Sequence, residues 1–145
     1  MTNTTIRRGT AAHAAGTLVV LYAITFLLGA VLHLGVAIPL GVTVLTEPVI
    51  IPAAIVESFC ALGLAISGYA LFARKRWAWL ATIAAHGFAL AGVLLGMAAL
   101  AAGRGPSTVL NNAYHLTMLV LLAGGLVTLA TGVGRRALAS TDAAS

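Results

Sequence analysis

Four long apolar segments dominate this chain of 145 residues, and they cover residues 16–38, 50–72, 77–101 and 112–133. Each reaches the roughly 20 residues that a helix needs to cross a bilayer. The hydrocarbon core offers no water to peptide groups, so a spanning segment must hydrogen-bond its own backbone, as a helix does. No stretch alternates apolar and polar residues over the length of a barrel strand. The sequence therefore predicts an all-α integral membrane protein with four transmembrane helices.

The scarcity of charge supports the same conclusion. Only 8% of the residues are charged, whereas soluble domains average about 25%, so too few charges exist to cover a water-exposed surface. The connections between the segments are short, and helices joined by short loops pack as antiparallel neighbours. We therefore expect an antiparallel four-helix bundle with up-down-up-down topology. The single cysteine, Cys60, excludes an internal disulfide and a cysteine-rich metal motif.

The basic residues predict how the chain is oriented. Seven of the eight fall on one side if the chain crosses four times, namely Arg7, Arg8, Arg74, Lys75, Arg76, Arg135 and Arg136. By the positive-inside rule, the N-terminal segment 1–15 and the tail 134–145 are cytoplasmic, and we expect a multi-pass protein of the cell membrane. Charges grouped at helix ends are topology signals and do not form a nucleic-acid surface. The expected partners are the lipid bilayer and, in a larger assembly, another membrane protein.

Glu57 lies within the second apolar segment, where an ionised carboxylate costs roughly 2.5–3.5 kcal/mol. Such a group normally faces the protein interior. With a rise of about 1.5 Å per residue, His33, Glu57 and His115 all fall within roughly 6–13 Å of the outer boundary. His86 is deeper, near the middle of the third segment. Each of the four lies on a helical stripe with small residues, which predicts that they face inward.

Three interpretations of this cluster remain open. In the first, Glu57 hydrogen-bonds to His33, His115 or Tyr114 and holds the helices in register. In the second, the cluster lines a cavity in the outer half that binds a small apolar molecule, such as a quinone or a lipid, with Glu57 and a histidine as proton partners. In the third, His33, Glu57 and His115 ligate a metal, or the two histidines ligate haem. His86 is a secondary candidate.

Several short stretches resemble the DoxX-like four-helix membrane proteins. They are Phe26-Leu-Leu-Gly-Ala-Val-Leu-His33 in the first segment, Glu57-Ser-Phe-Cys-Ala-Leu-Gly63 in the second, and the basic turn 74–76. The resemblance covers residues 16–133 and places Gly29, His33, Glu57 and Gly63 on family positions. It implies a four-helix membrane fold and a quinone-linked, accessory or assembly role. The stretch 110–115 lies outside the family pattern.

The function that we expect is that of a DoxX-like small membrane protein whose outer-half pocket, centred on Glu57, binds a small apolar molecule or supports a larger complex. A proton-coupled small-molecule exporter is one alternative, although small multidrug exporters carry their essential glutamate in the first helix. A haem or metal redox protein is the other. No Ser-His-Asp set exists, because Asp142 lies in the tail, so no catalytic residue is assigned and an enzyme is not favoured.

Overall fold

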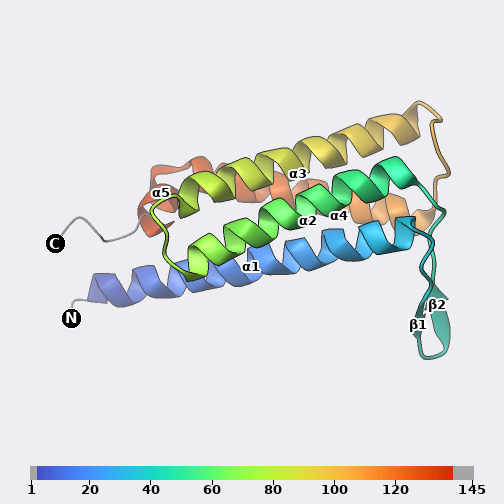
Figure 1. Ribbon diagram of the computed structural model, residues 1–145. Helices are drawn as coiled ribbons and strands as arrows, with labels where there is room; N and C mark the ends of the chain where they lie inside the picture. The colour runs from blue at the N-terminus through green and yellow to red at the C-terminus, as the bar shows by residue number, and fades with distance from the viewer. Residues whose placement is uncertain (1–2, 139–145) are drawn as a thin grey trace.

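The computed structural model describes residues 3–138, and it is a four-helix bundle (Figure 1). The elements follow one another as α1 (Asn3–His33), β1 (Ile38–Leu40), β2 (Thr43–Leu45), α2 (Ile51–Phe72), α3 (Ala78–Ala101), α4 (Val109–Ala130) and α5 (Gly132–Leu138). Consecutive long helices pack side by side, which confirms the all-α bundle with up-down-up-down topology. All four long helices are long and apolar enough to cross a bilayer, so the chain is a multi-pass membrane protein.

The first helix differs most from its expected bounds. It begins at Asn3 rather than residue 16, so most of the segment 1–15 continues the helix, and residues 1–2 lie outside the described part. It ends at His33 rather than residue 38, because Gly35 adopts a positive φ of 87° and its N–H donates to the carbonyl of Leu32 at 2.9 Å. His33 is therefore the last residue of α1, where the sequence placed it about five residues inside.

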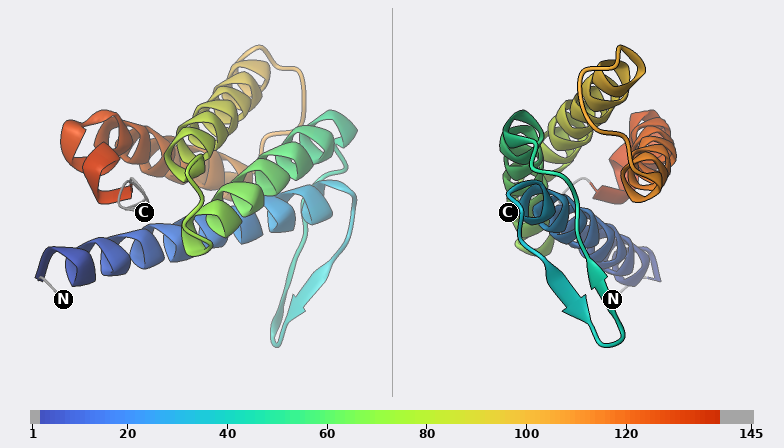
Figure 2. Two further views of the ribbon diagram at one scale, coloured as in Figure 1. Left: turned by 60° about the vertical axis from the view of Figure 1, so that its left-hand side comes forward. Right: turned by 90° about the vertical axis from the view of Figure 1, so that its right-hand side faces the viewer.

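The segment expected as a loop between the first two helices carries a small antiparallel hairpin. Ile38 pairs with Leu45 and Leu40 with Thr43, and Gly41 turns the chain with a φ of 73°. The hairpin runs across the helix axes beside the end of α1 (Figures 1 and 2). We call this end of the bundle the hairpin end. The base of the hairpin is attached to the bundle because the Ile50 N–H donates to the His33 carbonyl at 3.0 Å.

The last long helix begins at Val109 rather than residue 112 because Thr108 caps it. The Thr108 hydroxyl oxygen accepts from the Asn111 N–H at 3.0 Å, which satisfies one of the free donors of the first turn. The same hydroxyl contacts both carboxylate oxygens of Glu47 at 2.8 Å and donates its hydrogen to this carboxylate. This contact ties the base of the hairpin to α4, although 61 residues separate the two partners.

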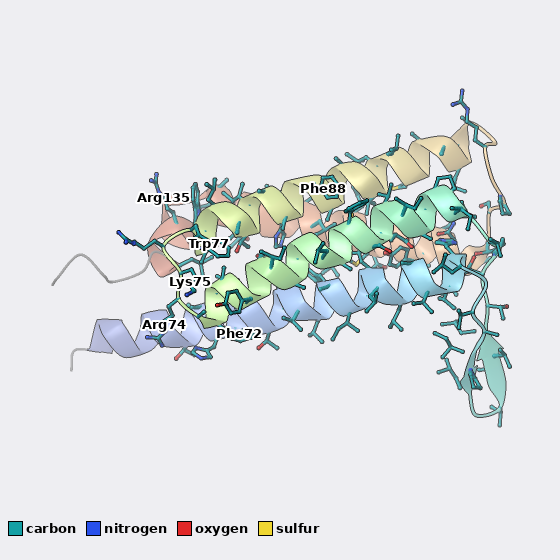
Figure 3. The ribbon with its side chains drawn as sticks, in the orientation of Figure 1. Phe72, Arg74, Lys75, Trp77, Phe88 and Arg135 are labelled. Atoms are coloured by element: carbon teal, nitrogen blue, oxygen red, sulfur yellow. The ribbon has the colours of Figure 1, made fainter. Side chains whose placement is uncertain are left out.

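The opposite end of the bundle, which we call the basic end, carries both described termini. Arg74, Lys75, Trp77 and Arg135 lie there (Figure 3). The Arg135 guanidinium lies 5.0 Å from the centre of the Trp79 ring, and a cation over an indole face is attractive. Charge is therefore concentrated at one end of the bundle, while large apolar side chains along the outward helix faces stay exposed to the surroundings.

Small and polar residues bring the helices close together in the interior. Ser67 of α2 donates to the Thr82 hydroxyl of α3 at 2.9 Å, and both side chains are fully buried. Gly92 of α3 faces α2 so closely that a Cβ there would lie 3.0 Å from Val56 and 3.2 Å from the Cys60 sulfur. Such contacts fix the rotation of each helix, and this rotation decides which side chains meet in the site.

Candidate functional site

Glu57 lies about two turns into α2 and faces the bundle interior with only 5% of its surface exposed. Its carboxylate rests on the backbone of α1 at Gly29. A Cβ at Gly29 would stand 2.9 Å from both carboxylate oxygens, a distance that real Cβ atoms do not show. Glycine is thus the residue that leaves room for the carboxylate between the two helices.

Neither carboxylate oxygen of Glu57 has a hydrogen-bond partner among the described residues. His33 lies close to the carboxylate, with its Nε2 3.9 Å from Oε1. The Tyr114 hydroxyl also interacts with the carboxyl group, but it makes no hydrogen bond of standard geometry and is itself buried without a partner. No hydrogen bond of standard geometry therefore joins Glu57 to His33 or Tyr114, and the register-holding interpretation stays a prediction.

The three buried histidines are oriented in the same way. Nδ1 lies 3.2 Å from the Pro48 carbonyl in His33, 2.8 Å from that of Thr82 in His86, and 2.9 Å from that of Asn111 in His115. A carbonyl oxygen can only accept, so we assign the proton to Nδ1 in each ring. The other nitrogen, Nε2, is then a free acceptor.

Two of these imidazoles also rest on glycines of the neighbouring helix. A Cβ at Gly96 of α3 would lie 2.7 Å from Nε2 of His115, and one at Gly125 of α4 would lie 3.1 Å from Nε2 of His86. His115 faces the same interior region as Glu57. His86 instead packs edge-on against Tyr22, with ring centres 5.9 Å apart.

A cavity of about 180 Å³ lies at the hairpin end, and we call it the Glu57 cavity. Its wall is mostly apolar and comes from all four long helices and the α3–α4 loop. The polar side chains in that wall are those of His33, Glu57, Arg104, Asn111 and His115. The cavity thus offers a hydrophobic surface with a few hydrogen-bonding groups, which is the usual character of a small-molecule site.

The sequence-predicted residues are distributed unequally around this cavity. His33, Glu57 and His115 line it together. Tyr114 lines a neighbouring cavity between α1 and α4, and His86 lines neither of the two. Sequence reasoning missed Arg104 and Asn111 as residues of the wall. The i, i+4 spacing of Asn111 and His115 was the signal that both occupy one face of α4.

Within residues 3–138, no group of three or more His, Cys, Asp or Glu side chains is placed to hold a metal ion. His33 and His115 both line the Glu57 cavity and each keeps a free Nε2, so they are well placed to contact a polar ligand group beside Glu57. No family model matches the chain, and no curated protein or solved structure matches it either.

Proposed function

We propose that this chain is a DoxX-like small protein of the cell membrane that binds a small, mostly apolar molecule in the Glu57 cavity. One observation carries the proposal: both Glu57 oxygens are buried without a hydrogen-bond partner in the described residues, in the wall of an apolar cavity of about 180 Å³. Burying a polar group without a partner costs roughly 1–3 kcal/mol in proteins, and a bound molecule that supplies a donor removes that cost.

The size of the cavity limits the ligand. An apolar cavity of about 150 Å³ takes up a benzene molecule. The Glu57 cavity, at about 180 Å³, therefore accommodates one ring or a short branched group rather than a whole lipid. A quinone-type ring and the head region of a lipid both meet this limit. The role that we propose is ligand binding, and the Glu57 carboxyl with the free Nε2 of His33 can hold a proton for the ligand.

The orientation belongs to the same proposal. Arg74, Lys75 and Arg135 lie at the end where the described termini lie, with Trp77 beside them (Figure 3). The hairpin end carries Arg104 in the wall of the Glu57 cavity. The positive-inside rule then puts both termini in the cytoplasm and the Glu57 cavity in the outer half of the membrane.

The test uses the purified protein in lipid nanodiscs with the reduced, quinol form of a short-chain ubiquinone analogue as the probe, because its hydroxyl groups can donate to the Glu57 carboxyl. The probe should raise the melting temperature of the wild-type protein. Glu57→Gln should abolish this rise without lowering the melting temperature of the ligand-free protein, because the native carboxyl has no hydrogen bond to lose. Ser58→Ala is the matched control, since Ser58 bonds only its own helix, at the Ala54 carbonyl, and should respond as wild type does.

Two results would contradict the proposal. One is a wild-type protein whose melting temperature does not respond to the reduced ubiquinone analogue. The other is a Glu57→Gln protein that is less stable without ligand and still binds the probe, which would make Glu57 a structural residue.

A further inference from the structure

A second cavity, of about 160 Å³, lies between α1 and α4 beneath the base of the hairpin, and we call it the α1–α4 cavity. Its apolar wall includes Leu28 and Leu32 of α1, Leu45 of the hairpin and Leu110 of α4. Leu28 is 47% exposed and Leu110 is 41% exposed. Both lie on helices long and apolar enough to cross a membrane, so the exposed surfaces of Leu28 and Leu110 are on the lipid-facing side of this cavity.

The opening exists because one pair of helices, α1 and α4, packs less closely than the pairs of consecutive helices. The extensive helix–helix packing runs from α1 to α2, from α2 to α3 and from α3 to α4, and α1 and α4 do not pack along their lengths. Near the hairpin end they meet through the rings of Phe26 and Tyr114, whose centres are 6.1 Å apart. A lipid-facing gap between the first and last helices therefore leads to the Tyr114 ring.

The inner end of the α1–α4 cavity reaches the Glu57 site. His33 and Asn111 line both cavities. Gly29, which lies in the wall of the α1–α4 cavity, is also the residue on which the Glu57 carboxylate rests. The unpartnered Tyr114 hydroxyl lies in the same wall and interacts with that carboxylate. The two cavities therefore adjoin at His33 and Asn111, with apolar side chains of α1 and α4 on one side and Glu57 on the other.

The chemistry of the polar end defines the head group that fits. The described buried atoms without partners include Glu57 Oε1, Glu57 Oε2 and Asn111 Oδ1, all of which accept hydrogen bonds. The free Nε2 atoms of His33 and His115 are acceptors too. Arg104 and the Tyr114 hydroxyl supply donors in the walls of the two cavities, but the acceptors around the Glu57 carboxyl group favour a neutral donor at that point.

We infer that the α1–α4 cavity admits a long-chain amphiphile sideways from the bilayer. Its hydroxyl head group donates to Glu57, and its hydrocarbon chain lies between α1 and α4 against Leu28, Leu32 and Leu110. This inference rests on the proposed ligand site at Glu57 and names the class of ligand, which is a hydroxyl-bearing molecule with a single chain.

The test is photolabelling in nanodiscs with hexadecanol that carries a diazirine a few carbons from its hydroxyl group. Saturable labelling, competed by unlabelled hexadecanol, should map by mass spectrometry to α1 and α4 near Leu28 and Leu110. Thr25→Trp places an indole at the exposed rim of the cavity and should reduce the labelling at least tenfold. Ile24→Trp is the control, because Ile24 is lipid-exposed on the same helix and lines neither cavity.

The outcomes separate this inference from the proposed function. Saturable labelling confined to the walls of α2 and α3, unaffected by Thr25→Trp, would overturn the sideways entry and leave the Glu57 site in place. Labelling that is not saturable, in a protein that does bind the ubiquinone analogue, would reject the hydroxyl-bearing chain as the ligand. Failure of both probes would reject both proposals. The wild-type labelling map decides the question even if Thr25→Trp fails to fold.

The hairpin carries a second, independent inference. Residues 34–46 contain no charged side chain. Leu40, Val42 and Val44 are all exposed, and Val42 is exposed over its whole surface. The hairpin extends across the helix axes at the level where α1 ends, so it runs parallel to the membrane surface (Figures 1 and 2). Its apolar surface continues the lipid-exposed face of α1 at Leu34.

We propose that this hairpin lies in the interfacial layer of the bilayer and inserts Val42 among the lipids. Pairing of its two strands satisfies part of its backbone, and its free strand edges can hydrogen-bond to water and head groups there. A spin label at Val42→Cys should be more accessible to oxygen than to a water-soluble nickel reagent. Ser107→Cys in the exposed α3–α4 loop should show the reverse order. Nickel accessibility equal to that of Ser107→Cys, or dipolar broadening between two copies at Val42→Cys, would overturn the proposal.

Discussion

His115 of α4 rests directly on Gly96 of α3, at a point where a Cβ would lie 2.7 Å from the imidazole Nε2. The arrangement recurs in this interior, since three ionisable side chains each contact a glycine of a neighbouring helix. The pairs are His115 with Gly96, His86 with Gly125 and Glu57 with Gly29. At each of these positions an alanine methyl group would crowd the polar side chain, and glycine leaves the space that this side chain needs. Each of these three side chains is therefore matched by a glycine on the helix that it faces.

The first prediction concerns Gly96→Ala. The ring of His115 cannot swing aside freely because its Nδ1 is held by the Asn111 carbonyl at 2.9 Å. We expect Gly96→Ala to destabilise the fold by about 1–3 kcal/mol, the usual cost of inserting a methyl group into a packed interior. The measurement is thermal unfolding in nanodiscs. Gly87→Ala is the matched control, because a Cβ at Gly87 meets nothing within 4 Å.

A double-mutant cycle tests the cause of this effect. Combining Gly96→Ala with His115→Ala should recover most of the loss due to Gly96→Ala, because the imidazole that the methyl group meets has been removed. Additive effects of the two substitutions would show that Gly96 is required for another reason.

The second prediction concerns Gly29→Ala, where the colliding atoms are the flexible end of Glu57. A carboxylate can rotate away more easily than a held ring, so the loss of stability should be about 1 kcal/mol, at the lower end of the range for overpacking. The displaced carboxylate should instead reduce binding of the ubiquinone analogue at least tenfold. Titration of the probe with wild type, Gly29→Ala and Gly124→Ala checks this, since a Cβ at Gly124 also meets nothing within 4 Å. Unchanged affinity in Gly29→Ala would contradict the proposed role of Glu57.

The fold could be predicted from the sequence because few backbone structures are stable within a membrane. Four apolar runs of spanning length can only become helices in hydrocarbon, and short connections make consecutive helices antiparallel. The common depth and helical stripe of His33, Glu57 and His115 also indicated that they face inward, and all three line the Glu57 cavity. These inferences need only the position of each residue along its own helix.

Other features depend on how helices rotate against one another, which periodicity does not specify. Gly92 and Gly96 stand four residues apart on α3, yet Gly92 allows α2 to approach closely and Gly96 makes room for His115 of α4. The hairpin leaves little signal in the sequence, because Pro39 and Gly41 are turn residues and each strand has only three residues. The α1–α4 cavity arises because first and last helices do not pack along their lengths, which no local pattern predicts.

The third prediction concerns Thr108, which both caps α4 and binds Glu47. Thr108→Ala removes the cap and the contact with the hairpin base, so unfolding should become easier by about 1–2 kcal/mol. Thr108→Ser keeps the hydroxyl and should retain most of the stability. Ser107→Ala, one residue away, loses only an exposed contact with Asn112 and should be close to neutral. Equal stability of Thr108→Ala and Ser107→Ala in thermal unfolding would contradict this account.

The last prediction concerns Arg74, which has a φ of 50° and is the one non-glycine residue with a positive φ in the described chain. It follows the end of α2, where its own N–H donates to the Leu71 carbonyl and the Lys75 N–H donates to that of Ala70. Gly35 and Gly103 occupy the equivalent position after α1 and α3, with the same pair of hydrogen bonds. A side chain in this left-handed conformation costs roughly 1–2 kcal/mol, and glycine avoids that cost.

Arg74→Gly should therefore stabilise the protein by about 1 kcal/mol, even though it removes a charge. The reciprocal change, Gly103→Ala, should destabilise by a similar amount through the backbone alone, because a Cβ there meets nothing within 4 Å. Thermal unfolding of the two variants gives opposite shifts if backbone strain dominates. A melting temperature that falls in Arg74→Gly would contradict this account. It would show that contacts of the arginine side chain with the membrane surface stabilise the basic end by more than the strained backbone destabilises the turn.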